Sequence, residues 1–109
     1  MDSAALLRLI SESTRHGLLK ALRGGERTVG ELVAALGDEQ SNVSHHLATL
    51  RREGLVSARR AGRKQVYRLA DAEVGRMLDQ VDALATRLDH VAYTAALGIP
   101  TDPAFHGYG

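Results

Sequence analysis

Two stretches with helical spacing, followed at once by a stretch with the spacing of strands, constrain this chain more than any other feature. Residues 28–37 and 41–54 place apolar side chains three and four residues apart, and each stretch ends at a glycine. Residues 55–69 change to two short runs rich in Val, Tyr and Leu, with Gly62 between them. The sequence therefore predicts two helices joined by a short turn and followed directly by a β-hairpin.

Further helices are predicted on both sides of this motif, over residues 3–12, 13–23 and 71–97. Thr28 is followed three residues later by Glu31, which is the sequence of a capping box. Other side chains that can cap helices stand near the expected starts: Ser3, Ser13 or Thr14, and Ser41. The expected fold class is mainly α with a small β-hairpin, an α+β winged helix-turn-helix. Residues 1–97 form the domain, and residues 98–109 form a tail.

Positive charge is concentrated in the region of the hairpin. The 109 residues include 14 Lys and Arg and 13 Asp and Glu, so the formal net charge is only +1. Seven of those basic side chains nevertheless lie within residues 51–68, where Glu53 is the one acidic residue. A basic stripe on a nearly neutral protein indicates contact with a polyanion such as nucleic acid. The alternative interpretation is a basic hairpin that is merely solvated.

Several classes of protein are excluded or disfavoured by what the sequence lacks. The chain has no cysteine, which excludes disulfides, thiolate metal sites and thiol redox switches. It has no apolar run of about 18 residues and no secretory signal pattern at its start, so a cytoplasmic location is expected. No nucleophile with an adjacent base, no phosphate-binding loop and no carboxylate pair is visible, so an enzyme is not expected.

The helix predicted over residues 71–97 carries an apolar stripe that is too wide and too long for one thin domain to cover. A symmetric pair of such helices across a homodimer axis would cover it, and a lid over the first helices is the alternative. The side chains expected at a dimer interface are Val74, Leu78, Val81, Leu84, Leu88 and Val91.

Residues 41–71, SNVSHHLATLRREGLVSARRAGRKQVYRLAD, resemble the ArsR/SmtB-type transcriptional regulators. The stretch is similar to that family's recognition helix and to its wing with a Gly-Arg turn, and residues 28–37 resemble the preceding helix. The resemblance implies a cytoplasmic homodimer that binds a palindromic operator in double-stranded DNA, usually as a repressor released by an effector. The alternatives are a metal-independent winged-helix regulator and a protein-interaction module without metal sensing.

The resemblance also implies which side chains contact DNA. Short polar side chains of the recognition helix would read base edges: Ser41, Asn42, Ser44 and His45. Thr49 and Arg52 lie later in that helix and would contact phosphates. The cations of the hairpin would hold phosphates or enter the minor groove: Arg59, Arg60, Arg63 and Lys64. Ser41 could instead be only a helix cap, and His46 is expected to pack beside the apolar stripe.

The metal sites of the family are matched poorly. Val33 and Ala35 stand where thiol-using relatives have cysteines, so arsenic or antimony sensing at that place is excluded. The second family site falls on two carboxylates and two side chains that cannot coordinate a metal: Asp71, Glu73, Leu84 and Arg87. A nitrogen–oxygen site for nickel or zinc would instead use His90, His106, Asp89 and His16.

Overall fold

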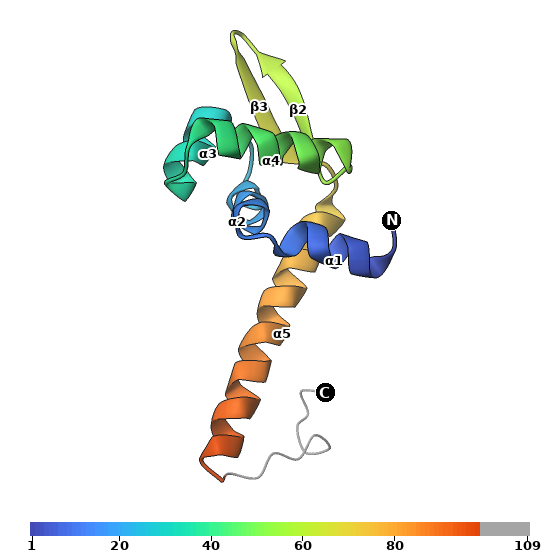
Figure 1. The fold of residues 1–109 in the computed structure, drawn as a ribbon, viewed down its shortest axis with the longest axis vertical. Coiled ribbons are helices and arrows are strands. Elements are labelled where there is room, and N and C mark those ends of the chain that lie inside the picture. Colours follow the sequence, from blue (N-terminus) through green and yellow to red (C-terminus); the bar gives the residue numbers. More distant parts are fainter. Residues whose placement is uncertain (99–109) are drawn as a thin grey trace. The chain divides into compact units, whose positions relative to one another are not determined.

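A computed structural model describes residues 1–98 of the chain, with the predicted order of helices and hairpin (Figure 1). The elements are α1 (Ser3–Ser11), α2 (Ser13–Leu22), β1 (Arg27–Thr28), α3 (Val29–Leu36), α4 (Gln40–Arg52), β2 (Val56–Ala61), β3 (Lys64–Leu69) and α5 (Ala72–Ala96). Residues 1–76 form one compact unit, and a second begins at Met77 within α5. The mainly helical fold with a small antiparallel sheet confirms the predicted fold class. Residues 99–109, most of the predicted tail, lie outside the described residues.

The first two helices begin with carboxylate caps instead of the predicted hydroxyl caps. Asp2 caps α1, where its Oδ1 accepts a hydrogen bond from the backbone N–H of Ala5 at 2.8 Å. Glu12 caps α2 by accepting from the backbone N–H groups of Thr14 and Arg15. The predictions of Ser3, and of Ser13 or Thr14, as caps are therefore wrong. Each carboxylate stands one or two positions earlier and makes a charge-assisted hydrogen bond, which is stronger than one to a hydroxyl.

The capping box of α3 is confirmed. The Thr28 hydroxyl accepts from the Glu31 backbone N–H at 3.2 Å, and the Glu31 carboxylate accepts from the Thr28 N–H at 2.9 Å. Gly37 ends α3 with a φ of +64°, a left-handed conformation that favours glycine. Helix α4 begins at Gln40 without a side-chain cap, so Ser41 lies inside the first turn and the cap interpretation for it is wrong.

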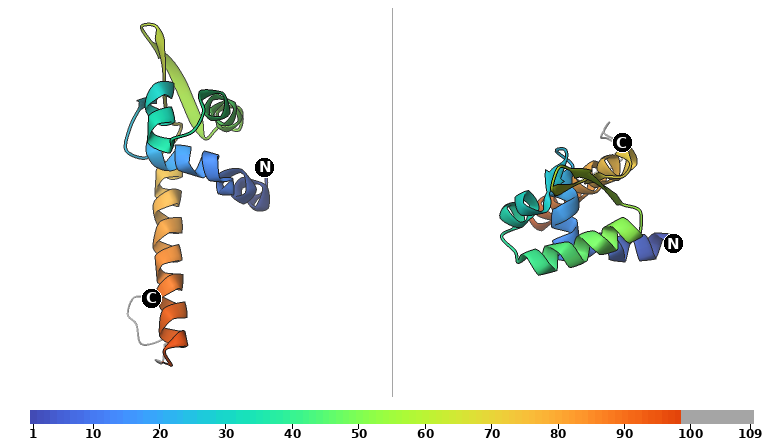
Figure 2. Two further views of the ribbon diagram at one scale, coloured as in Figure 1. Left: turned by 60° about the vertical axis from the view of Figure 1, so that its left-hand side comes forward. Right: turned by 90° about the horizontal axis from the view of Figure 1, so that it is seen from above.

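The core of the first unit is aliphatic and fixes α4 against α2 and α3. Three side chains of α4, Val43, Leu47 and Leu50, are each 0% exposed. They pack with other buried apolar residues of that unit: Ile10, Leu18, Leu19, Leu22, Leu32, Leu55 and Val56. Figure 2 shows α3 and α4 joined by a short turn, with the hairpin extending away from these helices.

The sheet has three strands in the order β1-β3-β2, all antiparallel to their neighbours. Ala61 pairs with Lys64, so the hairpin turn consists of Gly62 and Arg63, and Gly62 has a φ of +64°. Strand β1 was not predicted, because two residues are too few to show any periodicity. It forms because Arg27 and Thr28 pair with Tyr67 and Val66 of β3.

Helix α5 agrees within one residue at each end with the helix predicted over residues 71–97. None of the helices within residues 1–98 is both long enough and apolar enough to cross a membrane.

Candidate DNA-binding surface

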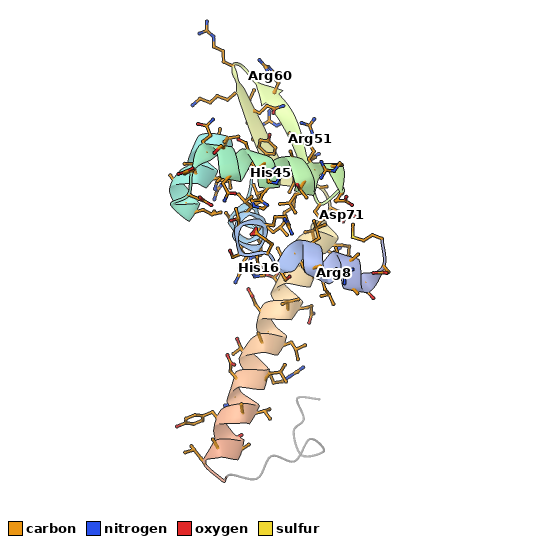
Figure 3. All side chains as sticks on the ribbon, in the orientation of Figure 1. Arg8, His16, His45, Arg51, Arg60 and Asp71 are labelled. Atoms are coloured by element: carbon orange, nitrogen blue, oxygen red, sulfur yellow. The ribbon has the colours of Figure 1, made fainter. Side chains whose placement is uncertain are left out.

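The burial of one face of α4 decides which of its side chains point outward. Ser41, His45 and Arg52 stand four and seven residues apart, on the side of the helix opposite Val43 and Leu47. All three are exposed, and so is Ser44 beside them. His45 is labelled in Figure 3. The outward face of α4 therefore carries hydroxyl, imidazole and guanidinium groups that can donate to or accept from base edges and phosphates.

Two further residues on this surface were not among the predicted contacts. Gln40 is the exposed first residue of α4, and an amide there can bind the edge of adenine with two hydrogen bonds. It was missed because the sequence placed the helix start at Ser41. Arg51 is also exposed near the end of α4 (Figure 3). The basic stripe of residues 51–68 already contained it, and that signal was sufficient to find it.

Asn42 makes hydrogen bonds within the protein, and its predicted contact with bases stays a prediction. It is half-buried, and its Nδ2 donates to Asp38 Oδ2 at 2.6 Å and to Thr14 Oγ1 at 3.4 Å. The Asn42 side chain, followed by the Glu39 backbone N–H, holds the pKa of Asp38 below its ordinary value. Asn42 thus ties the start of α4 both to the preceding turn and to α2.

Thr49 also makes an internal hydrogen bond. Its side chain is half-buried, and the hydroxyl donates to the His45 carbonyl oxygen, one turn earlier in α4, at 3.3 Å. The predicted phosphate contact by Thr49 stays a prediction.

His46 is a packing histidine that joins α4 to the first turn of α2. Its side chain is 14% exposed. Arg15 Nη1 lies 3.2 Å from His46 Nδ1, and Glu12 Oε1 lies 3.5 Å from His46 Nε2. A guanidinium can only donate, so Nδ1 accepts, and the ring proton of neutral His46 is on Nε2, facing the Glu12 carboxylate.

Glu12 serves two elements at once, because it caps α2 and faces His46 of α4. Burial raises its pKa, but the hydrogen bonds from the backbone N–H groups of Thr14 and Arg15 and the electrostatic influence of the nearby His46 ring and Arg15 lower it by more. The net result is a pKa below the ordinary value of 4.5, so the carboxylate is ionised at neutral pH.

The wing is defined here as strands β2 and β3 with their turn. Its four predicted DNA contacts fall into two groups, cations without a carboxylate partner within residues 1–98 and one cation that has such a partner. Arg60, Arg63 and Lys64 are exposed at or beside its turn. Arg60 is labelled in Figure 3. Arg59 forms an ion pair with Glu26, with Nε to Oε2 at 2.8 Å and Nη2 to Oε1 at 3.1 Å. Of these four predicted contacts, three are exposed cations without a carboxylate partner in the described structure and the fourth, Arg59, has one; Arg68 of β3 is a fifth exposed cation of the wing, and its Nε donates to Ser57 Oγ at 3.1 Å.

The candidate metal ligands are not brought together in the described part of the chain. Residues 1–98 contain no group of three or more His, Cys, Asp or Glu side chains placed to hold a metal ion. His16 Nδ1 lies 3.1 Å from the Ile10 carbonyl oxygen and donates to it. Asp89 and His90 are exposed on α5, and His106 lies outside the described residues.

The two carboxylates at the second family metal site are also engaged. Asp71 Oδ1 accepts from the Glu73 backbone N–H at 2.8 Å, at the start of α5. The Glu73 carboxylate forms an ion pair with Arg76. Asp71 therefore stabilises the first turn of α5, and Glu73 pairs with an arginine of the same helix.

The apolar stripe of α5 is exposed over most of its length. Val81, Leu84, Leu88 and Val91 are 38, 46, 57 and 37% exposed. Val74 is half-buried, and Leu78 is 1% exposed, so Leu78 has almost no surface left for a partner. The free part of the predicted interface thus begins at Val81.

A helix-turn-helix with an outward polar face, followed by a basic wing, defines the winged helix-turn-helix class of DNA-binding transcriptional regulators. The family described as "Bacterial regulatory protein, arsR family" matches residues 12–58. The chain is 41% identical to the HTH-type transcriptional regulator CmtR of Mycobacterium bovis, over 82% of this chain and 78% of CmtR. The chain therefore belongs to the ArsR family of bacterial regulators, and its relatives are transcriptional regulators rather than enzymes.

Other relatives agree with this assignment. The chain is 44% identical to the HTH-type transcriptional regulator NmtR of Mycobacterium tuberculosis, over 71% of this chain and 64% of NmtR, which is slightly less than two thirds of that protein. Among solved structures, HlyU of Vibrio cholerae matches with a TM-score of 0.68 and 35% identity, over 77% of this chain and 97% of HlyU. The homodimeric winged helix-turn-helix DNA-binding domain Mb0332 of Mycobacterium bovis matches with a TM-score of 0.71 and 33% identity, over 83 and 93% of the two chains.

We expect Glu12→Gln to lower the free energy of unfolding at neutral pH. The decrease of that free energy on acidification should also be smaller in the variant than in wild type. The pKa of Glu12 is lower in the folded protein than its ordinary value. Its stabilising contribution is therefore complete above pH 4.5 and is lost as the pH falls through the folded value. Urea denaturation between about pH 7 and about pH 3 measures this. Glu39→Gln is the control, because Glu39 precedes α4 without a side-chain cap bond. Equal acid dependence in Glu12→Gln and wild type would contradict the assignment.

Proposed function

We propose that the protein acts in the cytoplasm as a homodimer that binds a palindromic operator and represses transcription from it. The observation that supports this best is the combination on one unit of an outward polar face on α4 and exposed cations on the wing. A helix held by its apolar face can enter the major groove of DNA while presenting Ser41, Ser44 and His45 to base edges. Gln40 extends this set at the start of the helix.

The two parts of this surface have different roles in the proposal. Contacts to base edges distinguish sequences, whereas contacts to phosphates bind all sequences alike and weaken with salt. We assign base reading to the first turns of α4. We assign phosphate contact to Arg51 and Arg52 at its end and to Arg60, Arg63 and Lys64 of the wing.

Neutralising the tip of the wing should weaken binding to every duplex equally. For Arg63→Gln with Lys64→Gln, we expect the slope of log affinity against log salt to become shallower by about 0.9 per lost phosphate contact. Ser44→Ala with His45→Ala should instead narrow the gap between operator and random duplex, by about 1–3 kcal/mol per good base contact. Fluorescence anisotropy at several salt concentrations, with an operator selected from genomic fragments, measures both effects. A wing variant that loses operator preference but keeps its salt slope would reverse the assignment.

We propose that the apolar stripe of α5 is covered by the same stripe of a second copy. Val81, Leu84, Leu88 and Val91 recur at spacings of three and four, as in helices that pair along a seam. A symmetric pair would bury this face twice and would place two recognition helices on the two halves of a palindrome. The winged helix-turn-helix domain of Mb0332 is homodimeric, which supports the proposal.

Leu88→Glu should give monomers, because it places a charge inside the proposed interface on both copies. Thr86→Glu is the matched control, because it adds the same charge to the same helix on a face away from the stripe. Sedimentation at micromolar concentration should show a dimer for wild type and Thr86→Glu, and a monomer for Leu88→Glu. Operator binding should weaken only in Leu88→Glu. A monomeric wild type would overturn the proposal.

We propose further that a metal effector, where one acts, is nickel or zinc bound by imidazole and carboxylate groups. The chain has no thiolate to offer, and Asp89 and His90 are adjacent exposed ligand types on α5. Because residues 1–98 hold no three-ligand group, the site needs His106 or ligands from a second copy, such as its His16. The ligand residues would bind the ion and so couple its binding to formation of the dimer.

Calorimetric titration with nickel and with zinc tests this on the full chain. We expect binding to wild type that weakens below a pH of about 6.5, where imidazole is protonated. His90→Ala and His106→Ala should each weaken it at least about tenfold, because loss of a ligand costs no less than loss of a residue that only orients a ligand. Unchanged binding in both variants would eliminate this site, and no binding to wild type would leave a metal-independent regulator.

A further inference from the structure

The contact between Glu26 and Arg59 joins two strands that share no hydrogen bonds. Arg59 belongs to β2, Glu26 directly precedes β1, and β3 lies between these two strands in the sheet. Arg59 and Thr28 both pair with Val66 of β3, so these three side chains lie on one face. Glu26 stands two residues before Thr28, and strand alternation places it on the same face. The ion pair therefore crosses over the middle strand.

The geometry of the pair is bidentate. Two different nitrogens of the guanidinium, Nε and Nη2, donate to the two carboxylate oxygens at 2.8 and 3.1 Å. This arrangement uses both oxygens and fixes the orientation of the Arg59 side chain along the sheet. The hydrogen bond from Arg59, together with its charge and that of Arg68, keeps the pKa of Glu26 below its ordinary value of 4.5. The carboxylate is therefore charged at neutral pH.

The Glu26–Arg59 ion pair changes how much positive charge the wing offers to phosphates more than it changes the stability of the fold. Arg59 and Glu26 are 57 and 40% exposed, and exposed ion pairs contribute little to folding. A guanidinium that already holds a carboxylate adds little to the attraction for phosphates, and the carboxylate repels them. The free cations Arg60, Arg63 and Lys64 lie farther along the wing, toward the tip.

We propose that Glu26 and Arg59 form a clamp that fixes the middle of the wing to the start of β1 and withholds Arg59 from DNA. Glu26 is then a positioning residue that limits sequence-independent binding by the wing. The first half of this proposal concerns the free protein alone. The second half rests on the proposed DNA binding.

The clamp in the free protein is tested by NMR of the arginine side chains. The Nε–H of Arg59 should exchange with water more slowly than that of Arg60, and its signal should shift as Glu26 titrates below pH 4.5. Glu26→Gln should remove both effects and leave Arg60 unchanged. Equal exchange of Arg59 and Arg60, or no change in Glu26→Gln, would overturn the clamp whatever the protein does with DNA.

The effect on DNA is tested with random duplex at several salt concentrations. Arg63→Gln should make the salt slope shallower by about 0.9, the value for one phosphate contact, whereas Arg59→Gln should leave it unchanged. Glu26→Gln should make the slope steeper by about the same amount, because it releases Arg59. Glu53→Gln is the control, because it changes the net charge equally without an arginine partner in the described structure.

The outcomes separate the two proposals. If the salt slope becomes as shallow in Arg59→Gln as in Arg63→Gln, Arg59 is an ordinary phosphate contact. That result would overturn the proposal that the ion pair withholds Arg59 from DNA. An equally steeper salt slope in Glu26→Gln and Glu53→Gln would mean that only the net charge matters. That result would also overturn the withholding of Arg59. Wild type that binds neither operator nor random duplex would refute the proposed function, while the NMR measurement still decides the clamp.

Discussion

The rotation of α4 about its own axis is the constraint on which the functional surface depends. Val43, Leu47 and Leu50 are completely buried, and each such side chain contributes roughly 1.5–3 kcal/mol when it leaves water. Turning the helix by one residue would move these side chains toward solvent and bring Ser44 and Arg51 into an aliphatic core, where their polar groups would have no partners. The same three residues that stabilise the fold therefore decide that Ser41, Ser44 and His45 face outward.

Polar contacts add a second level of control over α4. Asn42 bonds to Asp38 and Thr14, and His46 lies against Arg15 and Glu12, so two successive turns of α4 are joined to the start of α2. Each contact is worth less than a buried leucine, but hydrogen bonds are directional and fix the helix along its axis. The wing is also held at two levels. Backbone pairing of β2 with β3 fixes its strands, and the hydrogen bond to Glu26 fixes the direction of the Arg59 side chain across the sheet.

The sequence predicted what depends on periodicity and on local chemistry. The helices, the hairpin turn at Gly62 and the capping box of Thr28 and Glu31 each follow from residues that are close in the chain, and all were confirmed. Partners far apart in the sequence could not be predicted in this way. Asn42 meets Thr14 over 28 residues and Arg59 meets Glu26 over 33, so their residue types suggested DNA contacts while the fold gives them partners within the protein. Strand β1 depends on β3 in the same way.

A backbone amide NMR titration with the selected operator duplex tests whether the outward face of α4 and the tip of the wing meet DNA together. We expect the largest signal changes in residues 40–52 and 60–64, with random duplex affecting the wing but much less the first turns of α4. Equal perturbation of the same residues by operator and random duplex, or changes on the stripe of α5 while α4 stays unaffected, would refute joint binding by α4 and the wing.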